Sequence, residues 1–257
     1  MGVTRVLAVR PYARCAIHAA MLSDAPLTIS LLFVATVVGM LLLVLGGAAR
    51  AARAVGPGAA RGVRLAGVAM AGWLALSAVL ADRGFFEDFY ALPPHMLLAV
   101  GPPLLAALAL TASGRLDPLL AAMPPSWPVG AQAFRIVVEI VLWRLAVAGV
   151  APEIMTFTGR NVDMLVGLSA PVVAYACFVR RVWPVRVARW WNWAGIVILL
   201  NVVLHAQLSA PTRFRVFETE PAATFIGDLP FIWLPAFLVP LAWALHAVSL
   251  RQLRSRR

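Results

Sequence analysis

The amino-acid sequence predicts an all-α membrane protein, a polytopic bundle of about seven transmembrane helices. Hydrophobic residues make up 62% of the 257 residues and charged residues only 13%, whereas a soluble domain is about 45–50% apolar and about 25% charged. Several apolar stretches reach the roughly 20 residues that a helix needs to cross a bilayer. None alternates like a transmembrane β-strand. This composition excludes a cytosolic globular enzyme and a disordered chain.

Seven segments have the length and composition of a spanning helix. They are apolar on every face, and small residues such as Gly39 and Gly67 permit close packing between helices. The transmembrane domain is therefore expected over residues 26–250, followed by a basic cytoplasmic tail over residues 251–257. The predicted spans are residues 27–49, 64–82, 95–113, 131–150, 162–179, 191–209 and 230–250.

The arginines predict the orientation of this bundle. They cluster at residues 50–64, 180–189 and 251–257, whereas acidic residues gather in the alternate loops. Because positively charged loops stay in the cytoplasm, these clusters indicate a cytoplasmic C-terminus and, with seven spans, an N-terminus outside.

The N-terminal segment, residues 1–25, conflicts with this orientation. It carries Arg5, Arg10 and Arg14, which the seven-span topology would leave outside. No apolar stretch and cleavage site of a signal peptide follow them. Two explanations stay open: translation starts at Met21, or the N-terminus lies inside and one span is miscounted.

The types of charged residue limit the cofactors and partners. All 22 positively charged residues are arginine, so a retinal Schiff base, which needs a lysine, is excluded. In a chain this apolar, the net charge of +11 indicates membrane orientation, and no nucleic-acid partner is expected. The histidines lack the i,i+4 spacing of a paired metal site, which argues against a metal and against haem. They are His18, His95, His205 and His246.

Glu139 is the most informative ionisable residue, because it lies near the middle of the span predicted at 131–150. Charged side chains at this depth are costly and usually face protein or water. Arg135 precedes Glu139 by four residues, so the two are expected to form an ion pair on one helix face. Asn201 is expected at the depth of Glu139 and His246 at the depth of Arg135. These four residues form a predicted polar cluster.

A second candidate site is a polar mouth on the outer side. Its residues lie at the start of the span predicted at 162–179 and around the loop that follows the span at 191–209. Such a mouth fits an anion, a headgroup or a metal, and a solvated rim of loop ion pairs is the alternative. The candidate residues are Arg160, Asn161, Asp163, His205 and Arg215.

Several strings in the second half of the chain are distinctive. Examples are FRIVVEIVLW (134–143), MTFTGRNVDMLVGLSAP (155–171) and SAPTRFRVFETEPAATFI (209–226). They resemble a family of bacterial multi-pass membrane proteins over roughly residues 130–253. The resemblance implies a location in the bacterial inner membrane and no particular activity.

Three kinds of function remain open. The favoured one is a protein that binds or translocates a small molecule, an ion or a lipid through the polar cluster. A membrane-embedded enzyme acting on a lipid or isoprenoid is the first alternative, although no catalytic motif is present. The second alternative is a non-catalytic structural subunit of a membrane complex.

Overall fold

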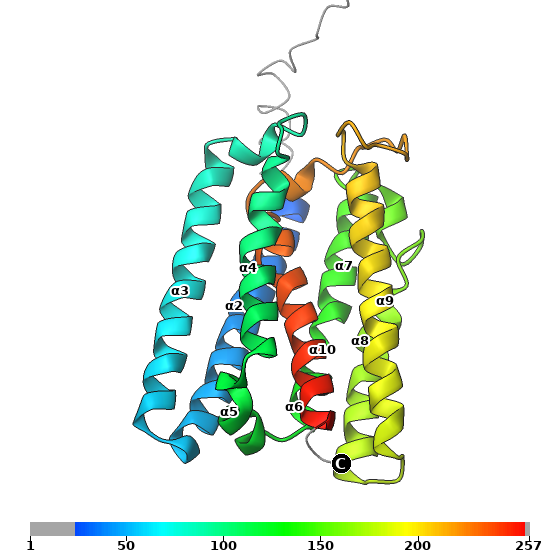
Figure 1. Cartoon of the computed structure of the whole chain (residues 1–257). Coiled ribbons are helices and arrows are strands. Elements are labelled where there is room, and N and C mark those ends of the chain that lie inside the picture. The colour runs from blue at the N-terminus through cyan, green and yellow to red at the C-terminus, as the bar shows by residue number, and fades with distance from the viewer. Residues whose placement is uncertain (1–23, 255–257) are drawn as a thin grey trace, which may run out of the picture.

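The computed structural model describes residues 24–254, and this part of the chain is helical, without strands (Figure 1). Short 3₁₀ and π-helical segments adjoin several of the helices. The α-helices are α2 (Asp24–Val55), α3 (Pro57–Asp82), α4 (His95–Ala112), α5 (Asp117–Ala122), α6 (Ser126–Ala131), α7 (Phe134–Val147), α8 (Asp163–Ala174), α9 (Val185–Ser209) and α10 (Val239–Arg254).

Five helical segments in the described part are long and apolar enough to cross a membrane, so this is a helical membrane protein. A helix of 18 or more residues spans most of the roughly 30 Å hydrocarbon core of a bilayer. The five segments are Leu27–Val55, Pro57–Asp82, His95–Ala112, Val185–Ser209 and Leu234–Arg254.

The other two predicted spans are helical but shorter than predicted. The segment at 131–150 forms α7, which has 14 residues and is separated from α6 by a turn at Gln132. Gly149, with a φ of 70°, lies just beyond its C-terminal end, in the left-handed region that glycine adopts without strain. The segment at 162–179 forms an apolar helical stretch from Asp163 to Val179. Seven spans are therefore not confirmed by helix length.

Charge is sorted between the two ends of the bundle. Figure 1 shows the α2–α3 turn, the α8–α9 turn and the end of α10 at one end. The arginine clusters at 50–64 and 180–189 lie at these turns, and we call this the basic end. The long loops at 83–94 and 210–229 lie at the opposite, acidic end.

Two predicted features lie wholly or partly outside the described residues. Residues 1–23 of the predicted N-terminal segment, with the alternative start at Met21, fall outside the described range. Of the predicted tail at 251–257, residues up to Arg254 continue α10 as helix.

The core is centred on α10, which packs against α4, α6 and α9. Its buried apolar residues pack with residues of α2 and α7 into the main hydrophobic cluster, which includes Phe33, Val141 and Leu245. α7 packs against both α2 and α8. This arrangement encloses the Arg135 and Glu139 side chains of α7 in the interior of the bundle, whereas Arg144 is exposed.

Candidate functional site

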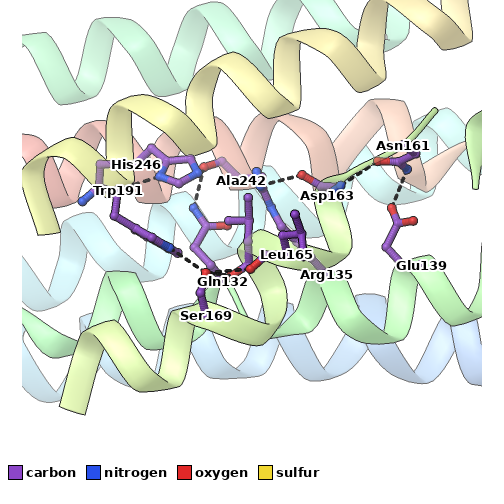
Figure 2. A network of polar contacts seen from close by, with 12 residues as sticks. Gln132, Arg135, Glu139, Asn161, Asp163, Leu165, Ser169, Trp191, Ala242 and His246 are labelled. Carbon is purple, nitrogen blue, oxygen red and sulfur yellow. Dashed lines mark hydrogen bonds and ion pairs between the residues drawn. The ribbon is translucent and has the colours of Figure 1, made fainter. Parts of the chain in front are cut away.

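Four buried polar residues form one continuous chain of contacts across α7 and the start of α8 (Figure 2). The Arg135 Nη1 atom lies 2.8 Å from Asp163 Oδ1. Asn161 accepts a 2.9 Å hydrogen bond from the Asp163 backbone N–H and donates a 2.6 Å hydrogen bond to Glu139 Oε1. All four side chains belong to residues with 6% or less of their surface exposed. We call these residues the central cluster.

The structure differs here from the predicted Arg135–Glu139 ion pair. The partner of Arg135 is Asp163, and the partner of Glu139 is the neutral amide of Asn161. The reason is the close packing of α7 and α8: a Cβ atom added to Gly167 would lie 2.9 Å from the Ile136 backbone nitrogen. This close approach brings the first turn of α8 opposite Arg135.

Asn161 and Asp163 were also predicted at the outer mouth, but the structure buries both residues, at 3% and 6% exposure. The connection between α7 and α8 is buried in part, with Ala151 at 1% and Met155 at 2% exposure, whereas residues 157–160 are exposed. The Asn161 amide donates a second hydrogen bond, 2.9 Å long, to the Met155 carbonyl oxygen. Asn161 therefore ties this connection to Glu139 inside the bundle.

The remaining mouth residues gather around Phe217 at the acidic end. Arg160 lies over the Phe217 ring, with its guanidinium carbon 5.4 Å from the ring centroid, and His205 stacks on the ring at 5.3 Å. Arg215 donates hydrogen bonds to the carbonyl oxygens of Phe217 and Thr219. In its ion pair with Glu220, the Glu220 side chain is 86% exposed, so the pair contributes little to stability.

Asn201 joins this outer group and not the central cluster. Its side-chain amide donates a 3.3 Å hydrogen bond to the Arg160 backbone carbonyl oxygen, and the Asn201 backbone carbonyl oxygen lies 2.8 Å from His205 Nδ1. The position of Asn201 along α9 could not predict this contact, because the contact depends on where the α7–α8 connection passes.

His246 belongs to a third, separate group near the basic end. Its Nδ1 atom lies 2.9 Å from Asn192 Oδ1, and the Asn192 amide donates a 2.9 Å hydrogen bond to Ser249. His246 is fully buried and packs on Gly195 of α9, where an added Cβ would lie 2.4 Å from its ring. This group joins α9 to α10.

A cavity of about 160 Å³ lies beside the central cluster. Arg135, Glu139 and Asp163 are its charged lining residues, Gln207 is the remaining polar one, and His246 does not line it. The apolar wall comes from α4, α7, α9, the segment preceding α10 and α10 itself. Its residues are Met96, Leu97, Val100, Phe134, Val138, Leu142, Met155, Leu199, Val202, Val203, Ala206, Ile226, Leu234, Pro235, Leu238, Val239 and Ala242.

Several buried polar atoms near this cavity have no hydrogen-bond partner within the described chain. They include Arg135 Nε and Nη2 and Glu139 Oε2. Burying a polar group without a partner is costly, so such atoms are uncommon and need an explanation. Here they belong to residues that line a cavity.

Three further polar residues link helices in the interior and were not predicted from the sequence: Gln132, Asn192 and Ser249. The Gln132 amide donates a 3.0 Å hydrogen bond to the Ala242 carbonyl oxygen, between the central cluster and His246 (Figure 2). The sequence could have indicated the two amide residues, Gln132 and Asn192, because a side-chain amide within an apolar stretch usually faces another helix. Within residues 24–254, no three histidine, cysteine or acidic side chains form a metal site.

A family model covers the part of the chain that contains the site. No curated protein sequence and no solved structure matches the chain. A family model described as a domain of unknown function, DUF8737, matches residues 92–254. This range includes the whole central cluster and the α4, α7, α9 and α10 walls of the cavity, and it contains the strings that carried the resemblance. The chain therefore belongs to the DUF8737 family.

Proposed function

We propose that the protein binds an amphiphilic small molecule or a lipid in the cavity of about 160 Å³ beside the central cluster. The observation that supports this is the composition of the cavity wall. It is apolar except for Gln207 and for three ionisable residues, Arg135, Glu139 and Asp163. Ligand sites commonly combine an apolar lining with a few convergent polar groups in this way.

The size of the cavity limits what enters it. An apolar cavity of about 150 Å³ holds a benzene molecule, so this cavity accommodates an aromatic ring or a short apolar segment. The polar group of the ligand would then lie against the central cluster, whose unpartnered atoms are Arg135 Nε and Nη2 and Glu139 Oε2.

We propose further that this site lies in a seven-pass protein of the bacterial inner membrane, with the N-terminus outside and the C-terminus in the cytoplasm. α6 and α7 together would make the fourth pass, and Asp163–Val179 the fifth. The gathering of the arginine clusters at the basic end supports a cytoplasmic position for that end. The cavity and the long loops would then face the outer half of the membrane.

The binding proposal is tested by filling the cavity. Val203 lines it from α9, whereas the next residue, Leu204, does not and is 48% exposed. Val203→Trp should therefore remove material that co-purifies with the wild-type protein in native mass spectrometry after gentle extraction. Leu204→Trp should retain it. Equal retention by both variants, or no bound material in the wild type, contradicts the proposal.

Proton translocation is a second candidate, favoured by a row of buried polar groups. Figure 2 shows Glu139, Arg135, Gln132 and His246 in sequence along the bundle. Each of them has at least one buried polar atom without a partner in the described chain. Proton flux into proteoliposomes that disappears in Glu139→Gln would favour translocation over simple binding. Flux unaffected by this substitution would exclude a pathway through Glu139.

A further inference from the structure

The charges along the site identify the class of ligand. The central cluster holds two carboxylates, Asp163 and Glu139, and one guanidinium, that of Arg135. The 2.8 Å contact pairs Arg135 with Asp163, which leaves Glu139 as the unbalanced carboxylate. A buried carboxylate needs a counter-charge or a proton. Glu139 lines the cavity, is 1% exposed, and its Oε2 atom has no partner in the described chain.

A second cavity is also lined by a residue with a negative formal charge. It measures about 170 Å³ and lies next to the first, because both are lined by Met96, Leu97 and Gln207. Among the described residues that line it, Asp88 is the one with a formal charge at neutral pH if histidine is neutral. The second cavity thus lies beside the loops of the acidic end, and the first lies beside the central cluster.

The acidic end as a whole reinforces this sign. Its loop segments, residues 83–94, 148–160 and 210–229, together with Asp82 at the end of α3, contain seven acidic residues and four arginines, a net charge of −3. None of these four arginines lines either cavity. Concentrated charge of one sign around an opening raises the local concentration of oppositely charged ligands.

We infer that the ligand is an amphiphilic cation, an apolar body that carries a protonated amine, and that Glu139 binds its ammonium group. The inference rests on the proposed binding function and specifies its ligand. An anionic head would add a third negative charge to a cluster that already has an excess of one. The unpartnered N–H groups of Arg135 instead suit a neutral oxygen on the same ligand.

Three probes with the same phenyl body test the sign of the charge: 4-phenylbutylammonium, 4-phenylbutanol and 4-phenylbutyrate. Binding is measured by calorimetry on the full-length protein in nanodiscs of neutral phosphatidylcholine, with empty discs subtracted. A hydrogen bond to a charged group contributes about 1.5–3 kcal/mol, so the amine should bind roughly ten- to hundredfold more tightly than the alcohol. The carboxylate should bind least tightly.

Glu139→Gln is the informative variant, since it removes the charge and preserves an oxygen that accepts from Asn161. It should abolish the preference for the amine, and detectable binding of the alcohol shows that the pocket is folded. Tighter binding of the carboxylate, or an amine preference that survives in Glu139→Gln, overturns the cation inference and leaves the binding function standing. If no probe binds and Val203→Trp retains the same co-purified material as the wild type, the proposed function fails as well.

Discussion

Removal of the charge of Arg135 is the perturbation whose outcome the structure predicts most specifically. Arg135 is 2% exposed, and its partner Asp163 lies at 2.8 Å with 8% of its side chain exposed. Two unit charges about 4 Å apart attract by about 4 kcal/mol at an effective dielectric constant near 20. Breaking a buried pair by removing one partner costs about 3–5 kcal/mol, in agreement with this figure. Arg135→Leu should lower the free energy of unfolding by that amount.

The second substitution distinguishes the two carboxylates. Arg135→Leu combined with Asp163→Leu removes both members of the observed pair, and apolar replacements of a buried pair are often neutral or stabilising. This double variant should recover to within about 1–2 kcal/mol of the wild type. Arg135→Leu combined with Glu139→Leu should not recover, because it leaves Asp163 buried without a guanidinium and also removes the acceptor of the Asn161 amide.

Unfolding by titration with sodium dodecyl sulfate in mixed micelles, followed by tryptophan fluorescence, measures these differences. The alternative pairing along one helix, Arg135 with Glu139, predicts the reverse order of the two double variants. Recovery in the Glu139 combination and none in the Asp163 combination would refute the reasoning.

The remaining predictions concern helix packing and orientation. Gly195→Ala should destabilise the protein by about 1–3 kcal/mol in the same titration, because its methyl group would overlap His246. Gly72→Ala, which meets no atom within 4 Å, should be neutral or stabilising by up to about 1 kcal/mol, and an equal loss in both variants would contradict the packing of α9 on His246. In a background without the native cysteines, Ala59→Cys should resist a membrane-impermeant maleimide in intact cells, and Glu218→Cys, at an exposed position of the acidic end, should react. The opposite labelling pattern would invert the proposed topology.

The fold class followed from composition and periodicity, because hydrophobicity is a property of the local sequence. A stretch that is apolar on every face is stable as a helix in lipid wherever its neighbours lie. All seven predicted segments are helical, and five of them have the length of a span. The two shorter helices begin after a turn, at Phe134 for α7, and after a partly buried connection, at Asp163 for α8. Those boundaries depend on packing against other helices.

The membership of the central cluster could be predicted from the sequence only in part. Arg135 and Glu139 stood out because ionisable residues in an apolar segment are costly and rarely lack a role. Their partners depended on the tertiary structure. The close approach of α7 and α8 at Gly167 brings Asp163 to Arg135 and Asn161 to Glu139, over 28 and 22 residues of sequence. Helical spacing within α7 carried no information about this approach.

Depth along the membrane normal was a weaker guide than the direction in which a side chain points. Asn201 and His246 were assigned to one cluster with Glu139 by depth, but each faces a different neighbour, the α7–α8 connection for Asn201 and Asn192 for His246. The rise of a helix along its axis is constant, so depth can be calculated from residue number. Rotation about that axis is set by the small residues and loops that each helix packs against. The central cluster and its cavity are therefore products of the tertiary structure, whereas the membrane location follows from the sequence.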